Sequence, residues 1–247
     1  MATIIPLSEG VFTIGHDKIF RPFNPETENL NDRPIGSLLV EVQPFLIVTD
    51  HDIMLFDTGL GFHIDGTLQI HQNLLRHGYR PEHVTKVFLS HLHKDHAGGM
   101  TYVDANGVAQ LSFPEAIYYI YQPEAEGALQ DSSLSYIPDE IRPVVQSEQV
   151  SWLQGESGYI GAEVQFFFSG GHSKHHIVFL FDDGKERIFF GGDEAPQLKQ
   201  MKIKYVAKYD YDGKKAMELR QQYADKGREE GWQFLFYHDV KTPVAVL

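Results

Sequence analysis

The sequence predicts a mixed α/β protein with sheets inside and helices outside. Short apolar runs of strand length outnumber the helical patterns but alternate with them along the chain, which favours layers of both kinds. Several of these runs also end or begin beside a Gly, a His or an Asp. Polar residues at strand ends are typical of a rigid scaffold that presents a site on its loops.

The N-terminal half predicts one loop, three strands and one helix. Residues 20–34 are rich in Pro, Asn and Glu and predict the loop. Apolar residues from Leu68 to Leu75, with Gly78 after them, predict the helix. The predicted strands are residues 37–48, 53–56 and 84–89, and a polar turn at residues 49–52 joins the first two.

The C-terminal half predicts more strands and one long helix. Ala216, Leu219 and Tyr223 repeat at intervals of three and four residues, which predicts a helix over residues 213–226. A shorter helix is predicted at residues 123–130. The predicted strands are residues 116–121, 164–168, 177–181, 187–190 and 233–237.

Length and composition fit one globular domain. A chain of 247 residues can bury one generous core, and no repeat, charge block or low-complexity linker divides it. Hydrophobic residues make up 42% and charged residues 22%, which excludes a disordered or fibrous protein. We therefore expect a single domain over residues 1–247.

Charge and cysteine content narrow the chemistry. The formal net charge of −13 makes nucleic acid an unlikely partner, because binding to a phosphate backbone depends on cationic contacts. The chain has no Cys and 13 His. Thiol nucleophiles, thiolate zinc sites and iron–sulfur clusters are therefore excluded, while imidazole and carboxylate ligands are plentiful.

The N-terminus does not resemble a signal peptide, since it lacks a basic segment, a long apolar segment and a small-residue cleavage site. Apolar runs such as residues 177–181 are too short to cross a bilayer. These features predict a cytoplasmic protein without membrane attachment.

The strongest chemical signal follows the strand predicted at residues 84–89. Four of the six residues at positions 91–96 can bind a metal, and they are His91, His93, Asp95 and His96. A turn at the strand end would spread these side chains around one point. A solvated His-rich loop is the alternative interpretation.

Three further candidates stand at other strand ends. His172 and Asp193 each follow a Gly-Gly pair after an apolar strand, and His238 follows the last apolar strand directly. Each alone could be a strand-end cap or a turn residue. Their joint occurrence after the His-rich motif indicates metal ligands instead.

Together these residues resemble the metallo-β-lactamase-fold hydrolases. In that superfamily an Asp-Thr-Gly, a His-x-His-x-Asp-His, a Gly-His turn, a Gly-Asp turn and a late strand ending in His follow one another along the chain. The matching positions are Asp57-Thr58-Gly59, His91, His93, Asp95, His96, Gly171-His172, Gly192-Asp193 and His238. The resemblance implies an αβ/βα four-layer sandwich, with two central sheets flanked by helices and a dinuclear site at one edge.

The resemblance also implies how the ligands divide. The first metal takes His91, His93 and His172, the second takes Asp95, His96 and His238, and Asp193 bridges them. Asp57 is expected to accept a hydrogen bond from a ligand imidazole and to fix its tautomer. Imidazoles and carboxylates suit zinc, iron or manganese, and two divalent ions, zinc by expectation, are the cofactors.

A dinuclear site of this kind implies a hydrolase. Two metals about 3.5–4 Å apart lower the pKa of a bridging water and generate a hydroxide, with Asp95 and Asp193 as the catalytic carboxylates that hold the ions. The chain has no Cys, no Gly-x-Ser-x-Gly motif and no phosphate loop that would supply another mechanism.

The loop of the third ligand departs from the family. Many relatives carry Thr-Pro-Gly-His twice there, whereas this chain lacks both prolines around His172. His176 falls where the second His stands, and we expect it to support the fold or a ligand. His175 is expected to be exposed.

One branch of the family is the closest in appearance. Residues 208–220 resemble the Asp-containing helix start of the N-acyl-homoserine lactonases, but Pro196 stands where those enzymes often have Tyr. Tyr205, Tyr209 and Tyr211 are expected to be packing residues. Whether residues 20–34 form a lid stays open.

The leading function is attack on an ester-like carbonyl, most plausibly that of a lactone or carboxylic ester. A glyoxalase II-like thioesterase and a phosphodiesterase or nuclease of the same fold are the alternatives, and an iron redox protein or a non-catalytic scaffold fits less well. The thioesterase would need basic residues near the site, for which Lys174 and residues 199–204 are the candidates. The expected partner is a small-molecule substrate, and the oligomeric state stays open, a homodimer included.

Overall fold

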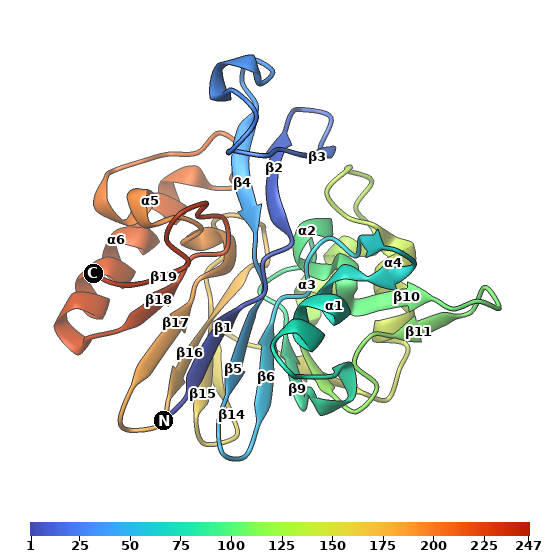
Figure 1. Cartoon of the computed structure of the whole chain (residues 1–247). Helices are drawn as coiled ribbons and strands as arrows, with labels where there is room; N and C mark the ends of the chain where they lie inside the picture. Colours follow the sequence, from blue (N-terminus) through green and yellow to red (C-terminus); the bar gives the residue numbers. More distant parts are fainter.

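Two six-stranded sheets form the centre of the computed structural model, which describes residues 1–247 (Figure 1). The first sheet has the order β1 (Thr3–Pro6), β5 (Phe45–Val48), β6 (Ile53–Phe56), β9 (Lys86–Phe88), β12 (Ile117–Tyr121) and β13 (Val150–Leu153). The second has the order β14 (Ser157–Ile160), β15 (Val164–Phe168), β16 (Ile177–Asp182), β17 (Arg187–Phe190), β18 (Gln233–Leu235) and β19 (Val244–Val246).

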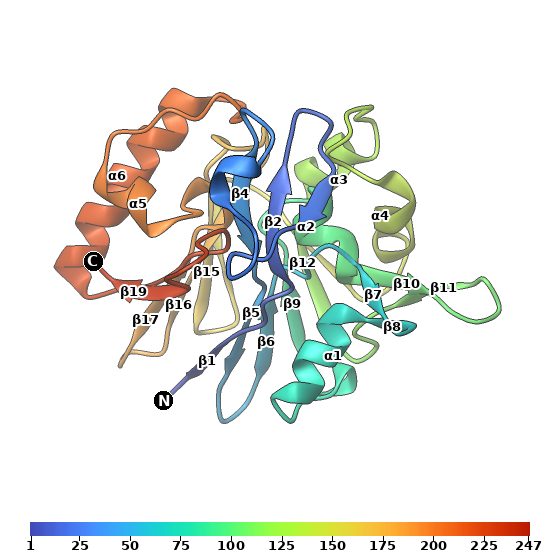
Figure 2. The ribbon, with the colours of Figure 1, turned by 45° about the horizontal axis from the view of Figure 1, so that its top comes forward.

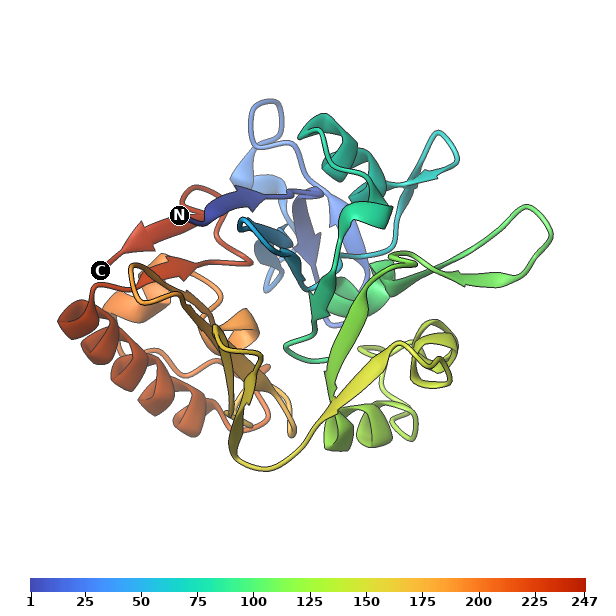
Figure 3. The same cartoon turned by 90° about the horizontal axis from the view of Figure 1, so that it is seen from below.

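Helices cover the outer face of each sheet, as Figure 3 shows from below. On the first sheet lie α1 (Gln69–Arg76), α3 (Gln122–Ala128) and α4 (Pro138–Val145). On the second lie α5 (Leu198–Lys202) and α6 (Gly213–Glu230). The predicted αβ/βα four-layer sandwich is therefore confirmed.

The main core lies between the two sheets. Along β6, Met54 and Phe56 point into this core while Leu55 packs under the outer helices, because successive strand residues face opposite sides. The ring of Phe179 from β16 lies 5.9 Å from Phe56 and 5.3 Å from Phe88, so aromatic contacts join the two sheets.

A small third sheet stands at the end of the sandwich, at the top of Figure 1. It has the order β3 (Phe20–Pro22), β2 (Gly10–Ile14) and β4 (Leu38–Val42). Two predictions were wrong here. Residues 20–22 form an edge strand rather than loop, because Phe20 pairs with Ile14. Residues 37–48 split into β4 and β5 at Pro44, which has no N–H to donate to a continuous ladder.

The remaining elements are short. They are η1 (Leu30–Asp32), β7 (His63–Ile64), β8 (Thr67–Leu68), η2 (Pro81–His83), α2 (Lys94–Ala97), η3 (Gly98–Met100), β10 (Thr101–Val103), β11 (Ala109–Leu111) and η4 (Gly192–Glu194). Two of them, α2 and η4, carry site residues predicted from the sequence.

The predicted strands and helices agree closely with the structure in the C-terminal half. The predicted strands at 164–168 and 187–190 have the bounds of β15 and β17. The long helix runs further than predicted, to Glu230, and ends at Gly231, whose φ of 70° lies in the left-handed region that glycine favours. No helix of the chain is both long and apolar enough to cross a bilayer.

Candidate metal centre

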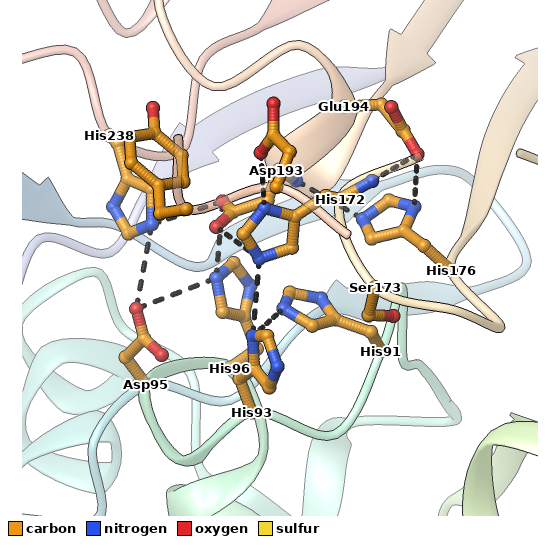
Figure 4. A network of polar contacts seen from close by, with 12 residues as sticks. His91, His93, Asp95, His96, His172, Ser173, His176, Asp193, Glu194 and His238 are labelled. Atoms are coloured by element: carbon orange, nitrogen blue, oxygen red, sulfur yellow. Dashed lines mark hydrogen bonds and ion pairs between the residues drawn. The ribbon is translucent and has the colours of Figure 1, made fainter. Parts of the chain in front are cut away.

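All seven residues predicted as metal ligands meet at one end of the sandwich (Figure 4). The strands β2 and β4 of the small third sheet lie over this end, near α2, in Figure 2. The segment after β9 and the short helix α2 bring four of them, and the segments after β15, β17 and β18 bring one each. The seven are His91, His93, Asp95, His96, His172, Asp193 and His238. They meet because neighbouring strands of both sheets end at the same edge.

Three histidine nitrogens form the first group of potential ligands. His93 Nδ1 lies 2.9 Å from His91 Nε2 and 3.2 Å from His172 Nε2. Nitrogens bound tetrahedrally at roughly 2.0–2.1 Å from one zinc lie about 3.3 Å apart. The spacing of the three nitrogens therefore fits one metal ion.

A second group lies beside the first. Asp95 Oδ2 is 3.6 Å from His96 Nε2 and 3.5 Å from His238 Nε2. One carboxylate and two imidazoles at this separation could hold a second divalent ion.

Asp193 lies between the two groups (Figure 4). Its Oδ2 is 3.1 Å from His172 Nε2 in the first group. Its Oδ1 is 3.0 Å from His238 Nε2 and 3.3 Å from His96 Nε2 in the second. Each oxygen thus faces a different group, which is the arrangement that a bridging carboxylate requires.

Buried polar atoms without partners give an independent indication that the site binds cations. His96 Nε2 and Asp193 Oδ1 are both buried without a hydrogen-bond partner. Leaving such atoms unsatisfied is costly, and metal coordination would satisfy both. The donor set and its geometry therefore fit divalent metals.

The pKa shifts agree with this interpretation. Burial lowers the pKa of His91 and His93 well below the usual range, so both imidazoles are neutral as metal ligands must be. Burial also lowers the pKa of His96, but the carboxylates of Asp193, Asp95 and Asp57 outweigh it and raise that pKa well above normal. Asp57 faces Nδ1 of this ring while Asp95 and Asp193 face Nε2, so the carboxylates on the Nε2 side define a site that attracts cations.

Asp57 positions His96, a member of the second group of potential ligands. Its Oδ2 accepts a hydrogen bond from His96 Nδ1 at 2.6 Å, and Ser90 donates its backbone N–H to Oδ1 and its hydroxyl to Oδ2. The backbone of Asp57 has a φ of 55°, in the left-handed region that Asp tolerates better than most residues. The carboxylate therefore lies where the prediction required it, on the far side of the His96 ring.

Asp210 does the same for His172, and the sequence did not identify it. Its Oδ1 lies 2.9 Å from His172 Nδ1, and its side chain is 1% exposed. The other oxygen lies 3.9 Å from the buried Arg220 guanidinium. Asp210 thus fixes the ring so that Nε2 faces the first group. The only signal was its place in residues 208–220, whose resemblance to the lactonase branch drew attention without assigning a role.

Two glutamates make backbone hydrogen bonds that position His172 and His238. The Glu194 carboxylate binds backbone N–H groups at His172, and the backbone carbonyl of Glu41 binds the His238 ring. Glu194 Oε1 accepts the N–H groups of Gly171 and His172 at 2.6 and 2.8 Å. A Cβ on Gly171 would lie 2.6 Å from the Glu194 carboxylate, so only glycine fits there. His238 Nδ1 donates to the backbone carbonyl of Glu41 at 2.6 Å.

His176 and His175 differ in environment. His176 is fully buried, its Nε2 accepts the N–H of Asp193 at 3.2 Å, and its Nδ1 lies 2.9 Å from Ser169 Oγ. It therefore holds the backbone of Asp193 in place, in line with the expected supporting role. His175 is half-buried rather than exposed, so that prediction was wrong.

A cavity of about 610 Å³ opens onto both groups. Tyr205, Tyr209 and Tyr211 line it, although packing was the favoured interpretation of these residues and a pocket lining the alternative. Residues of the third sheet form an apolar wall, and the residues of that wall are Ile14, Phe20, Leu38, Leu39 and Val40. From the predicted loop 20–34, only Phe20 lines the cavity.

The fold and the site together define an α/β sandwich with a candidate His/Asp metal site at one end. A family model described as the metallo-beta-lactamase superfamily matches residues 40–228, which is most of the chain. The chain therefore belongs to this superfamily. The prediction of an enzyme of this family of metal-dependent hydrolases is confirmed at the level of the superfamily. A search of curated proteins finds no match.

Solved structures resemble the chain over nearly its whole length. A probable metal-dependent hydrolase from Staphylococcus aureus has a TM-score of 0.77 at 20% identity, and the match covers 98% of this chain and 91% of the other. AidC, a dizinc quorum-quenching lactonase solved with its product, has a TM-score of 0.74 at 18% identity, covering 99% and 90%. An N-acyl homoserine lactone hydrolase, with N-hexanoyl-L-homoserine at its catalytic metal centre, has a TM-score of 0.66 at 20% identity, covering 96% and 93%. At these identities the likeness shows a shared fold.

Proposed function

We propose that the chain is a dinuclear metal-dependent hydrolase that cleaves an ester-like carbonyl, most plausibly that of a lactone or carboxylic ester. The position of Asp193 between two groups of potential ligands is the observation that carries the proposal. Two of the three similar structures described above are lactonases, which favours this substrate class among the chemistries that the fold supports.

The ligand division follows the two groups. His91, His93 and His172 hold the first ion, Asp95, His96 and His238 hold the second, and Asp193 spans them. Zinc is the ion that this nitrogen-rich set suits well, and iron and manganese are alternatives to be measured. When bound, two such ions activate a water as nucleophile and polarise the carbonyl that it attacks.

The residues around the ligands keep that chemistry in place. Asp57 and Asp210 fix the rings of His96 and His172, so that each Nε2 faces its group. The apolar wall of the third sheet, with residues such as Phe20 and Val40, offers room for the acyl part of a substrate and keeps water from it.

The core between the sheets contains side chains from both six-stranded sheets. We therefore propose that residues 1–247 act as one domain.

A thioesterase is the second candidate, and one observation favours it. Lys174 and Lys199, which the sequence offered as binding residues for an anionic thioester, both line the cavity. A thioester and an oxygen ester undergo the same attack on the carbonyl, so the site geometry alone does not separate them.

Metal analysis combined with a substrate panel tests these proposals. We expect about two metal ions per chain and turnover of lactones or nitrophenyl esters that stops on chelation and returns on adding metal. Faster turnover of thioesters would support the second candidate. Turnover of phosphodiesters alone would contradict both.

A further inference from the structure

The cavity wall is basic although the chain is strongly acidic. The formal net charge is −13, and yet four lysines line the cavity. Of the four acidic residues that line it, Asp95 and Asp193 belong to the proposed metal ligands and Asp210 is engaged by His172. The fourth, Asp131, is exposed and accepts the N–H of Ser133 at 2.6 Å. The lysines are Lys18, Lys94, Lys174 and Lys199, and none of them forms an ion pair with a carboxylate.

Lys18 is presented by a rigid turn between β2 and β3. Its backbone N–H donates to Gly15 O at 3.1 Å, and its φ of 56° lies in the left-handed region, which is uncommon for Lys. The neighbouring Asp17 does not neutralise it, because Arg21 Nη2 lies 2.6 Å from the Asp17 carboxylate. The turn therefore carries an unpaired ammonium at the cavity.

Lys94 stands next to the proposed metal ligands, directly after His93 and before Asp95. Lys18 and Lys94 line the same cavity, and both residues are half-buried. The Asp95 carboxylate beside Lys94 belongs to the proposed metal ligands. Two ammonium groups on one partly buried wall, neither of them in an ion pair, favour an anionic group in that cavity.

Resting on the proposed hydrolase function, we infer that the enzyme takes substrates whose acyl part carries a carboxylate or phosphate group, and that Lys18 and Lys94 bind this anion. The rest of the acyl part lies along the apolar wall, and its carbonyl faces Asp193. Lys174 and Lys199 are exposed and contribute less, because water screens their charge. The two inner lysines are thus specificity-determining residues for an anionic ester, thioester or lactone.

Binding measurements test this inference independently of turnover. Calorimetric titration of the metal-loaded protein compares glutarate with monomethyl glutarate, which share one carboxylate for the metals and differ in the second. We expect glutarate to bind at least about tenfold more tightly, and Lys18→Asn with Lys94→Gln to abolish the difference. Asn suits the left-handed backbone of position 18, so the variant keeps the turn. A phosphonate analogue, 4-phosphonobutyrate, stands in for a phosphate group and shows by its affinity relative to glutarate which anion is preferred.

Two controls complete the experiment. Lys208→Met removes an exposed lysine that does not line the cavity and should leave the preference intact. Lys18→Arg keeps the charge and should preserve most of it. Equal affinity for glutarate and its monomethyl ester in the wild type, or an unchanged preference in the double variant, would overturn the inference. Failure of every ester in the substrate panel would count against the proposed function but leave this binding result standing.

Discussion

Asp57 Oδ2 lies 2.6 Å from His96 Nδ1, and neither side chain has any exposed surface. Burial raises the pKa of Asp57, while His96 and Ser90 oppose that rise through charge and hydrogen bonds. The charged form of the Asp57 carboxylate is therefore stabilised by His96 and Ser90. The other nitrogen of His96, Nε2, lies in the group proposed to bind the second metal.

Replacing Asp57 should therefore weaken metal binding without removing a ligand. Asp57→Asn leaves an amide that cannot accept as strongly from His96 Nδ1, and we expect about 10–100-fold lower affinity for the second ion. Competition with a chelating dye measures it. Asp52→Asn, which removes a carboxylate paired with Lys86 at the other end of β6, is the matched control. Equal affinities in the two variants would contradict the role of Asp57.

A second pair of variants, at Asp210 and Asp212, distinguishes a residue that orients a metal ligand from a residue that caps a helix. Asp210→Asn should lower affinity for the first ion by about 10–100-fold, because Asp210 Oδ1 holds His172 Nδ1. Asp212 lies two residues on and accepts the N–H of Lys215 at the start of α6. Asp212→Ala should cost about 1 kcal/mol of stability and leave metal affinity unchanged. Metal titration and urea unfolding of both variants check this, and the reverse pattern would refute the assignment.

The contrast between Asp57 and Asp210 shows what the sequence could predict. Asp57 stands at a strand end in a recognisable Asp-Thr-Gly, and the seven candidate ligands likewise follow apolar strands, so strand pattern and residue type were sufficient. Asp210 follows no strand and reaches His172 from 38 residues away. Nothing in its local sequence indicates that its carboxylate is buried.

The errors in the predicted fold also occur where contacts with distant residues, rather than the local sequence, determine the structure. The strand β16 is a nearly continuous apolar run that is buried on both faces, and it was predicted to within one residue. Residues 20–22 include only one buried residue, and their strand exists because β2 lies beside them. The helix α4 contains Pro143 and was not predicted, since its stability comes from packing on the first sheet.

The proposed bridging role of Asp193 predicts a difference in metal stoichiometry. Asp193→Ala removes an oxygen from each group, so we expect loss of most of both ions and of activity while the chain stays folded. His238→Ala removes a ligand from the second group alone and should leave about one ion bound. Elemental analysis with circular dichroism distinguishes the two. Two ions retained by Asp193→Ala would show that this carboxylate does not bridge.

Glu9 predicts how stability depends on pH. It is 6% exposed, its Oε2 accepts the N–H of Leu60 at 2.7 Å, and burial raises its pKa from 4.5 to about 8. Because the folded chain holds this proton more firmly than the unfolded chain, the free energy of unfolding should fall as the pH rises from about 4.5 to about 8, by at most about 1.4 kcal/mol per pH unit.

Glu9→Gln should remove this dependence, because the amide oxygen still accepts from Leu60 N and carries no charge at any pH. We expect the variant to be more stable than the wild type at pH 9 and similar to it at pH 5. Urea unfolding at both pH values, with a chelator present so that metal binding does not contribute, measures the difference. A wild type and variant that change in parallel between pH 5 and pH 9 would mean that Glu9 ionises at the same pH in the folded and unfolded chains.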